Sequence, residues 1–293
     1  MTTAVATPKI STERMTIHAS YAALVVACIG FALTGLGNIL AAPTVTTYPS
    51  RLSWILQFVG PMLLALAVTL HIDHLSPRIG RSAVVLIIVG AFLTAVSSAP
   101  FMFTPSLYTE EAWFNLNFVL WGVGYIAMGL GLASVALHKE KQLEHALAEP
   151  TASAGAESDY NLTVHASFLS LITASVGLIL YAIGYLQLVG NPLGSRSAWS
   201  LQTIGGMLIA LGIATHITHL RRRIGTLAVV FGLLGAVCMA FSCLPYAVNP
   251  NNIVSPAWGQ CWWNVWGAGA VFAAISVGLV IFRKQSIEAE ATS

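Results

Sequence analysis

Residues 51–80 read RLSWILQFVGPMLLALAVTLHIDHLSPRIG, and residues 196–225 read RSAWSLQTIGGMLIALGIATHITHLRRRIG. Each stretch begins with about 20 mostly apolar residues, the length that crosses the hydrocarbon core of a bilayer, and ends in histidine and arginine. Aligned on their first arginines, the two stretches share Trp, Gln, Gly and Met in the apolar run and His-Ile-x-His-Leu after it. The pattern predicts a membrane span that occurs twice in the chain.

The repeat extends over both halves of the chain. TIHASY at residues 16–21 corresponds to TVHASF at 163–168, and WGVG at 121–124 corresponds to WGAG at 266–269. Eight apolar runs are present, at about residues 20–42, 52–75, 82–99, 113–137, 166–189, 199–220, 226–245 and 261–282. Because each half has an even number of spans, both halves enter the membrane in the same orientation. We therefore predict an all-α integral membrane protein whose eight transmembrane helices form two parallel four-helix repeats, related by a pseudo-two-fold axis along the membrane normal.

The composition supports a chain embedded in a lipid bilayer. Of the 293 residues, 56% are hydrophobic and only 8% are charged, and the mean hydropathy is +0.77. That is too little charge to cover the surface of a water-soluble protein. The net charge of +2 comes mainly from short loops between spans. It therefore indicates membrane topology and no nucleic-acid partner.

The positions of the basic residues predict the orientation. Of the 13 Lys and Arg residues, only Arg51 and Arg196 fall on one side of the eight-span arrangement. The positive-inside rule then places both termini in the cytoplasm of a multi-pass protein of the cell (plasma) membrane. Residues 1–138 form the first repeat, residues 139–164 a charged and then Ala-, Ser- and Glu-rich cytoplasmic linker, and residues 165–293 the second repeat.

Six histidines fall where spans reach the predicted cytoplasmic face, three in each half: His18, His71, His74, His165, His216 and His219. Histidines three residues apart share a helix face, and neutral imidazole is the commonest metal ligand. The set fits haem b, with one ligand from each of two helices, or a transition metal such as zinc, copper or iron. Asp73 could orient a ring in the first half only, because Thr218 replaces it in the second. The alternative is that these histidines bond the last helix carbonyls without any ligand.

Other polar and aromatic residues lie within the spans. Gln57 and Gln202 are either donors to a quinone carbonyl or bonds between helices. A group of tryptophans near the opposite face is typical of interface anchors, and the alternative is an aromatic pocket for an isoprenoid or sterol-like lipid: Trp113, Trp121, Trp258, Trp262, Trp263 and Trp266. The glycines that recur in both halves, among them Gly30 and Gly122, predict close packing between helices.

The leading functional hypothesis is haem or metal binding in membrane electron transfer, with quinone as a partner. A second hypothesis is a transporter or channel for a small or lipid-like solute, with the interface between the halves as its path. A third is a non-catalytic subunit that assembles with other membrane subunits. The chain has no P-loop, H-E-x-x-H or G-x-S-x-G motif. Asp73 is the one acidic residue in a predicted span, which argues against a proton pump. Whether the protein is an enzyme stays open.

Overall fold

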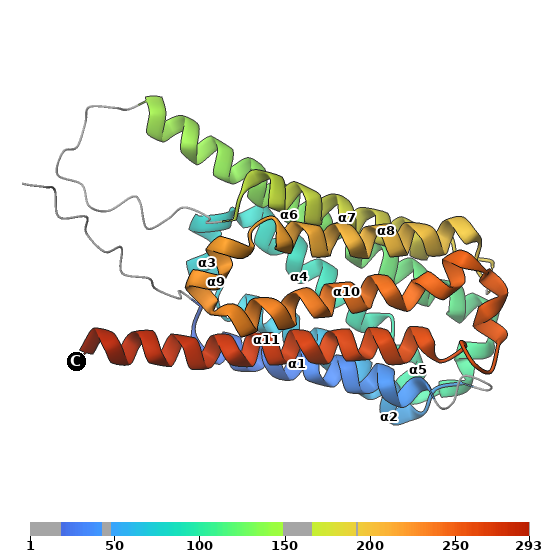
Figure 1. Ribbon diagram of the computed structural model, residues 1–293. Coiled ribbons are helices and arrows are strands. Elements are labelled where there is room, and N and C mark those ends of the chain that lie inside the picture. The colour runs from blue at the N-terminus through green and yellow to red at the C-terminus, as the bar shows by residue number, and fades with distance from the viewer. Residues whose placement is uncertain (1–18, 43–47, 149–165, 192, 293) are drawn as a thin grey trace, which may run out of the picture.

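The computed structural model describes residues 19–42, 48–148, 166–191 and 193–292, and the regular structure in these ranges is helical (Figure 1). Eight helices are long and apolar enough to cross a membrane. They are α1 (Tyr21–Ala41), α2 (Arg51–Thr69), α4 (Arg81–Val96) with its continuation α5 (Ala99–Phe103), α6 (Glu111–Ala148), α7 (Phe168–Leu186), α8 (Arg196–Ala214), α10 (Thr226–Val248) and α11 (Cys261–Thr292). The prediction of a multi-span, all-helical membrane protein is confirmed.

Serine side chains define where four of these helices begin. Ser20 Oγ accepts a hydrogen bond from the backbone N–H of Ala23 at the start of α1, and Ser50 does the same for Ser53 at the start of α2. Ser167 and Ser195 cap α7 and α8 in the same way. An N-cap serine satisfies a backbone donor that has no partner within its helix. The apolar runs of α1, α2, α7 and α8 therefore start at a defined residue.

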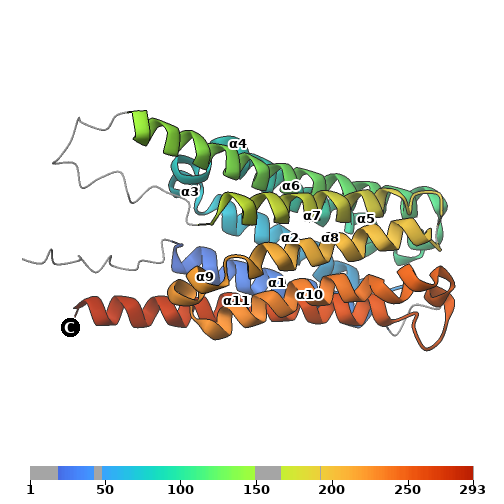
Figure 2. The same cartoon turned by 45° about the horizontal axis from the view of Figure 1, so that its top comes forward.

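The long helices form a closed ring in chain order. Each one packs against two neighbours, from α1 through α2, α4, α6, α7, α8 and α10 to α11, which returns to α1. The helices run along one common direction (Figure 2). Large apolar side chains are exposed on the outer surface of the ring, for example Leu36 on α1, Phe92 on α4 and Leu211 on α8. Such a surface suits contact with lipid tails rather than water.

Glycines allow the helices to approach closely, as the sequence predicts. A Cβ atom built on Gly30 of α1 would lie 2.9 Å from the carbonyl oxygen of Gly60 on α2. A Cβ atom on Gly177 of α7 would lie 2.6 Å from the carbonyl oxygen of Gly205 on α8. Backbone contact of this kind is what small residues provide between membrane helices. The prediction of close packing at these glycines is confirmed.

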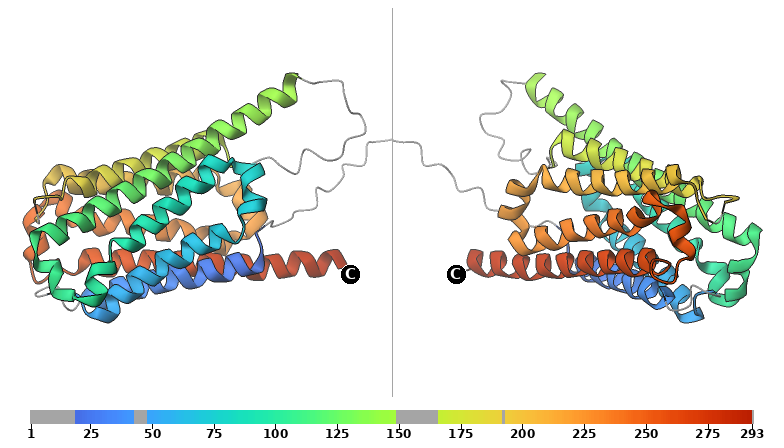
Figure 3. Two further views of the ribbon diagram at one scale, coloured as in Figure 1. Left: turned by 180° about the vertical axis from the view of Figure 1, so that it is seen from behind. Right: turned by 45° about the vertical axis from the view of Figure 1, so that its right-hand side comes forward.

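The predicted spans 52–75 and 199–220 are wrong at their second ends. Helix α2 ends at Thr69, and a separate helix α3 (Ile72–Ile79) follows with His71 as its N-cap; α9 (Ile217–Ile224) follows α8 in the same way. Both short helices lie at one end of the bundle (Figures 1 and 3), which we call the histidine end. The physical reason is that their charged residues would be costly in hydrocarbon, so the chain turns before reaching them.

The opposite end of the bundle carries α5, η2 (Pro105–Thr109) and η4 (Pro250–Val254), and we call it the aromatic end. Most of the buried aromatic rings of the structure form one connected core cluster: Trp54, Phe101, Phe118, Trp121, Tyr125, Tyr181, Tyr185, Trp199, Tyr246, Trp262, Trp263 and Trp266. Aromatic rings packed in this way gain both from burial and from ring contacts. The cluster therefore packs the helices together on the inner side of the helix bundle.

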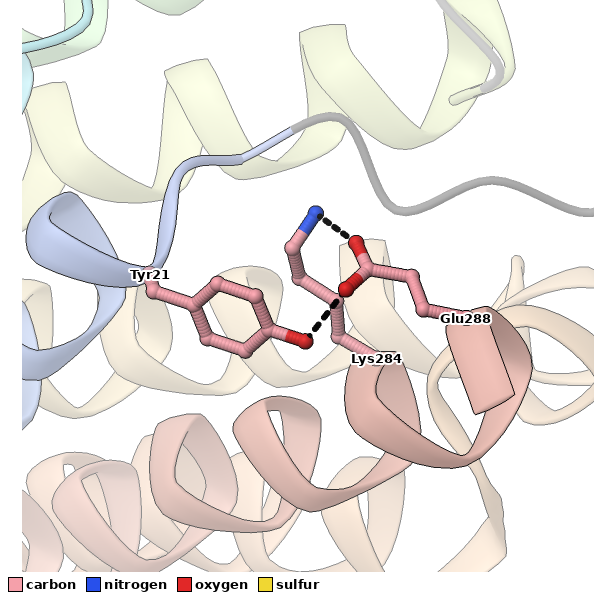
Figure 4. Close-up of polar contacts among 3 residues, drawn as sticks. All are labelled: Tyr21, Lys284 and Glu288. Atoms are coloured by element: carbon pink, nitrogen blue, oxygen red, sulfur yellow. Dashed lines mark hydrogen bonds and ion pairs between the residues drawn. The ribbon is translucent and has the colours of Figure 1, made fainter. Parts of the chain in front are cut away.

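At the histidine end, α6 and α11 extend beyond their predicted ends. Helix α6 continues past His138 to Ala148, into the segment that the sequence assigns to the linker. The extension of α11 is tied to the start of α1: Tyr21 Oη donates to Glu288 Oε2 at 2.7 Å, and Lys284 Nζ lies 2.9 Å from Glu288 Oε1 (Figure 4). These polar contacts join the first and last helices where the ring closes.

Candidate functional site

A cavity of about 360 Å³ lies inside the ring and is called the central cavity here. Residues of α1, α2, α4, α6, α8, α10 and α11 line it, so its wall includes both halves of the chain. Most of the lining is apolar, with side chains such as Phe31, Leu64 and Met128. An apolar space of this size falls in the range of small-molecule sites.

The polar residues of the wall come mostly from the first half of the chain. Thr34 Oγ1 donates to the carbonyl oxygen of Gly30 at 2.8 Å, and Asn38 Nδ2 donates to the carbonyl oxygen of Thr34 at 2.8 Å. Gln57 Nε2 donates to Ser53 Oγ at 3.0 Å, which fixes the direction of the amide. Gln57 Oε1 is then buried with no hydrogen-bond partner. The first half therefore offers an unused hydrogen-bond acceptor in the wall.

Two tryptophans of the same wall have an indole N–H group without a hydrogen-bond partner. Trp121 and Trp266 both line the central cavity, and their ring centroids lie 6.1 Å apart. The Nε1 atoms of both rings are buried and have no hydrogen-bond partner. A buried polar group without a partner costs about 1–3 kcal/mol. A guest that accepts from an indole and donates to Gln57 would recover part of that cost.

The second half of the chain fills the space that the first half leaves open. The sequence repeat pairs Thr34 with Tyr181 and Asn38 with Tyr185, and both tyrosines are fully buried. Tyr185 stacks on Tyr125, with ring centroids 5.7 Å apart and planes 4° apart. Helix α7, which carries both tyrosines, contributes no residue to the lining among the described residues. Helix α1 therefore lines the central cavity, and α7, its counterpart in the repeat, does not.

Gln202 has a different environment from Gln57. Its Oε1 accepts a weak hydrogen bond from Cys243 Sγ at 3.4 Å, between α8 and α10. Gln202 is fully buried and does not belong to the lining of the central cavity in the described part of the chain. In this half the amide therefore joins two helices, one of the two roles that the sequence left open.

The histidines are brought together in pairs. The ring centroids of His71 and His74 lie 4.7 Å apart, and those of His216 and His219 lie 4.9 Å apart. The Nε2 atoms of His71 and His216 are buried without a hydrogen-bond partner. His18 and His165 lie outside the described residues.

The histidine end also concentrates positive charge. Burial lowers the pKa of Arg78, and the like charge of Arg223 from the other half acts in the same direction. Burial likewise lowers the pKa of His74, with smaller contributions from Arg78 and His71. Among residues 19–42, 48–148, 166–191 and 193–292, no group of three His, Cys, Asp or Glu side chains is placed to hold a metal ion. No described histidine lines the central cavity.

Two further residues at this end differ in their surroundings. Asp73, predicted to orient a histidine, is exposed on α3. His138 lies on α6 with Nε2 3.3 Å from the carbonyl oxygen of Pro77 on α3. His138 therefore helps to hold α3 against the bundle.

The prediction of interface anchors is wrong for four of the six tryptophans, which are buried in the interior: Trp121, Trp262, Trp263 and Trp266. Trp113 and Trp258 are exposed, and for them it stays a prediction. The interior set supports the alternative of an aromatic pocket. The sequence reasoning missed the small wall residues of the first half, and the signal was present: where one copy has Thr and Asn, the other has two tyrosines.

No protein-family model, curated protein or solved structure matches this chain. What the chain binds is therefore inferred from its own geometry. The central cavity has a defined volume, a mostly apolar wall and three lining residues that each carry a buried polar atom without a partner: Gln57 Oε1, Trp121 Nε1 and Trp266 Nε1.

Proposed function

We propose that this protein binds a small, mostly apolar, ring-bearing solute of the quinone and quinol class in the central cavity. The observation that carries the proposal is the cavity of about 360 Å³ between the two halves. An apolar cavity of about 150 Å³ holds one benzene ring, so the central cavity has room for a substituted ring.

The polar atoms of the wall support this class of solute. Quinone carbonyl oxygens would accept hydrogen bonds from the indole N–H groups of Trp121 and Trp266, and a quinol hydroxyl would donate to Gln57 Oε1. Sites of this kind are apolar with a few placed polar groups that fix orientation. The quinone partner inferred from the sequence is retained, with the indoles rather than the glutamine amide as donors, because Gln57 Nε2 already donates to Ser53.

The internal repeat and its orientation belong to the same proposal. Matched pairs of close helix contacts, at Gly30 with Gly60 and at Gly177 with Gly205, support two parallel four-helix units. The ring in chain order supports a pseudo-two-fold axis that passes through the central cavity. The basic residues of α3 and α9 support a cytoplasmic location for the histidine end in the plasma membrane.

The test of the function is equilibrium binding of duroquinone (tetramethyl-1,4-benzoquinone) to the full chain in lipid nanodiscs. Duroquinone has no free ring position for addition of the free cysteine thiols. We expect saturable binding above that of empty nanodiscs, and at least a 30-fold loss of affinity in Ala236→Leu, which fills the cavity from α10. Val230→Leu is the matched control, because Val230 is exposed on the same helix. No saturable binding by the wild type, or wild-type affinity in Ala236→Leu, would disprove the proposal.

A second candidate function is haem b or transition-metal binding at the histidine end, coupled to electron transfer with the quinone. The observation that favours it is the buried, unpartnered Nε2 of His71 and His216, each beside a second imidazole. His18 and His165 would complete each three-histidine set. An absorption spectrum of the purified protein with a Soret band, or a stoichiometric metal by elemental analysis, would support it. Neither signal in protein purified from cells supplied with iron, copper and zinc would remove it.

A further inference from the structure

A second cavity, of about 220 Å³, lies at the aromatic end and is called the end cavity here. It lies between the two halves of the chain, with Tyr108 and Phe118 on one side and Trp199, Trp262 and Trp263 on the other. It is separate from the histidines, since no described histidine lines it. Nothing in the proposed function uses this space.

The lining of the end cavity has a definite chemistry. Its side chains are aromatic or aliphatic apart from the phenol groups of the tyrosines, and no charged side chain contributes to it in the described part of the chain. Trp262 Nε1 is buried without a hydrogen-bond partner. A volume of about 220 Å³ exceeds the roughly 150 Å³ that holds benzene. The end cavity therefore fits one substituted ring that carries a hydrogen-bond acceptor.

A change between the two halves opens this space. The sequence repeat pairs Phe114 of the first half with Gly259 of the second, and both line the end cavity. Gly259 is buried, so a larger side chain at this position needs space inside the protein. Its backbone φ is not positive, which means that other residues can adopt its conformation. The end cavity can therefore be filled by substituting a single residue.

A partition of aromatic rings separates the two cavities. Phe118 and Trp262 line the end cavity, and Trp121 lines the central cavity. The ring centroids of Trp121 and Trp262 lie 6.2 Å apart, and Tyr185 lies 5.2 Å from Trp121 and 5.9 Å from Phe118. The two spaces are thus separated by neighbouring aromatic rings, and these side chains would have to rotate for the spaces to join.

We infer that the end cavity is a second binding site for the same quinone-class solute and that the solute reaches the central cavity from it through the aromatic partition. The inference rests on the proposed function, because the central cavity is the destination. It adds a port on the aromatic end, a subsite of single-ring size and a contact from Trp262 to a carbonyl oxygen. The path then follows the interface between the two halves.

The experiment counts bound duroquinone per chain in nanodiscs and measures its association rate by stopped-flow quenching of tryptophan fluorescence. For the wild type we expect two saturable sites. Gly259→Leu should leave one site, keep the affinity of the central cavity and slow its filling at least tenfold, because blocking a path slows entry and exit alike. Ala236→Leu should also leave one site, the one in the end cavity. Val248→Leu, at an exposed position of α10, is the control for an added methylene group at this end.

The outcomes separate this inference from the proposed function. One saturable site in the wild type, with unchanged association in Gly259→Leu, would overturn the second site and its path while leaving the central site in place. No saturable site at all would overturn both. Two sites that both persist in Gly259→Leu would place the second solute elsewhere and would also overturn the inference.

Discussion

Gln57 and Gln202 occupy matching positions of the sequence repeat, yet Gln57 lies beside a cavity and Gln202 is packed between two helices. Gln57 has its N–H group fixed by Ser53 and lies in the wall of the central cavity. Gln202 accepts a hydrogen bond from Cys243 and is enclosed by protein on all sides. The same amide in the same helix position lines the central cavity in one half and is part of the packing in the other.

The neighbours of the two glutamines explain this difference. Thr34 and Asn38 are small and bond to their own helix, so space remains beside Gln57. Tyr181 and Tyr185 fill the matching space, and their rings lie 5.3 Å apart. The second half packs this region with two buried tyrosines, and the first half leaves it open as part of the central cavity. The two copies of a duplicated bundle can therefore differ in how tightly the same region is packed.

The largest effect is expected from opening the filled copy. Tyr185→Asn gives α7 the residue that α1 has at Asn38, and removes a fully buried ring that stacks on Tyr125. Loss of a buried aromatic ring costs about 3–5 kcal/mol in unfolding free energy. Denaturant unfolding in detergent micelles should show this loss. A destabilisation no larger than that of Asn38→Ala would mean that the tyrosines do not carry the packing.

The second expected effect comes from closing the open copy. The double variant Thr34→Tyr, Asn38→Tyr gives α1 the side chains that α7 has and fills the central cavity. We expect duroquinone affinity to fall at least 100-fold, or about 2.8 kcal/mol. Equilibrium binding in nanodiscs measures it. Leu36→Tyr, at an exposed position of α1, is the control, and equal losses in both variants would contradict the comparison.

A smaller effect should distinguish the two glutamines directly. Gln57→Leu removes the unused acceptor Oε1 from the wall, so durohydroquinone, which donates a hydrogen bond, should bind about tenfold more weakly. Binding of durene, which has no polar group, should not weaken. Gln202→Leu should change neither affinity, because Gln202 lies outside the lining. Equal effects of the two substitutions would break the comparison.

The smallest effect concerns protonation at the histidine end. Burial is the main cause that lowers the pKa of His74, and Arg78 adds to it. In Arg78→Gln the pKa of His74 should rise and still stay below the ordinary value of about 6.5. Arg223→Gln, in the other half, should change it less. Titration of the His74 ring by NMR measures both, and an unchanged pKa in Arg78→Gln would exclude the charge effect.

The sign of the pH dependence follows from the lowered pKa. The unfolded chain binds a proton at His74 more readily than the folded chain does, so His74 disfavours the folded state as the pH falls below about 6.5. Above that pH the ring is neutral in both states and the effect disappears. Protonation of His74 therefore lowers the stability of the folded state only under acidic conditions.

The sequence predicts the ring helices because a span needs only length and hydrophobicity, and it predicts close packing at Gly30 because no other residue allows backbone contact there. It does not predict the break at His71, because the apolar and helical pattern continues across Thr69 without a proline or glycine. It also places Trp121 and Trp266 at the membrane interface, since composition cannot distinguish a ring that faces lipid from one that faces the interior. The central cavity depends on side-chain volume at facing positions, which becomes visible only when the helices are placed around one axis.

The contact between α1 and α11 has a consequence for biosynthesis. Helix α1 is synthesised before α11, and the two pack against each other where the ring closes. Until α11 inserts, Gly35 of α1 lacks the backbone of Gly267 against which it packs, and Tyr21 lacks the carboxylate of Glu288. Until α11 inserts, the ring is therefore open between α1 and α10, and the central cavity lacks the part of its wall that α11 supplies.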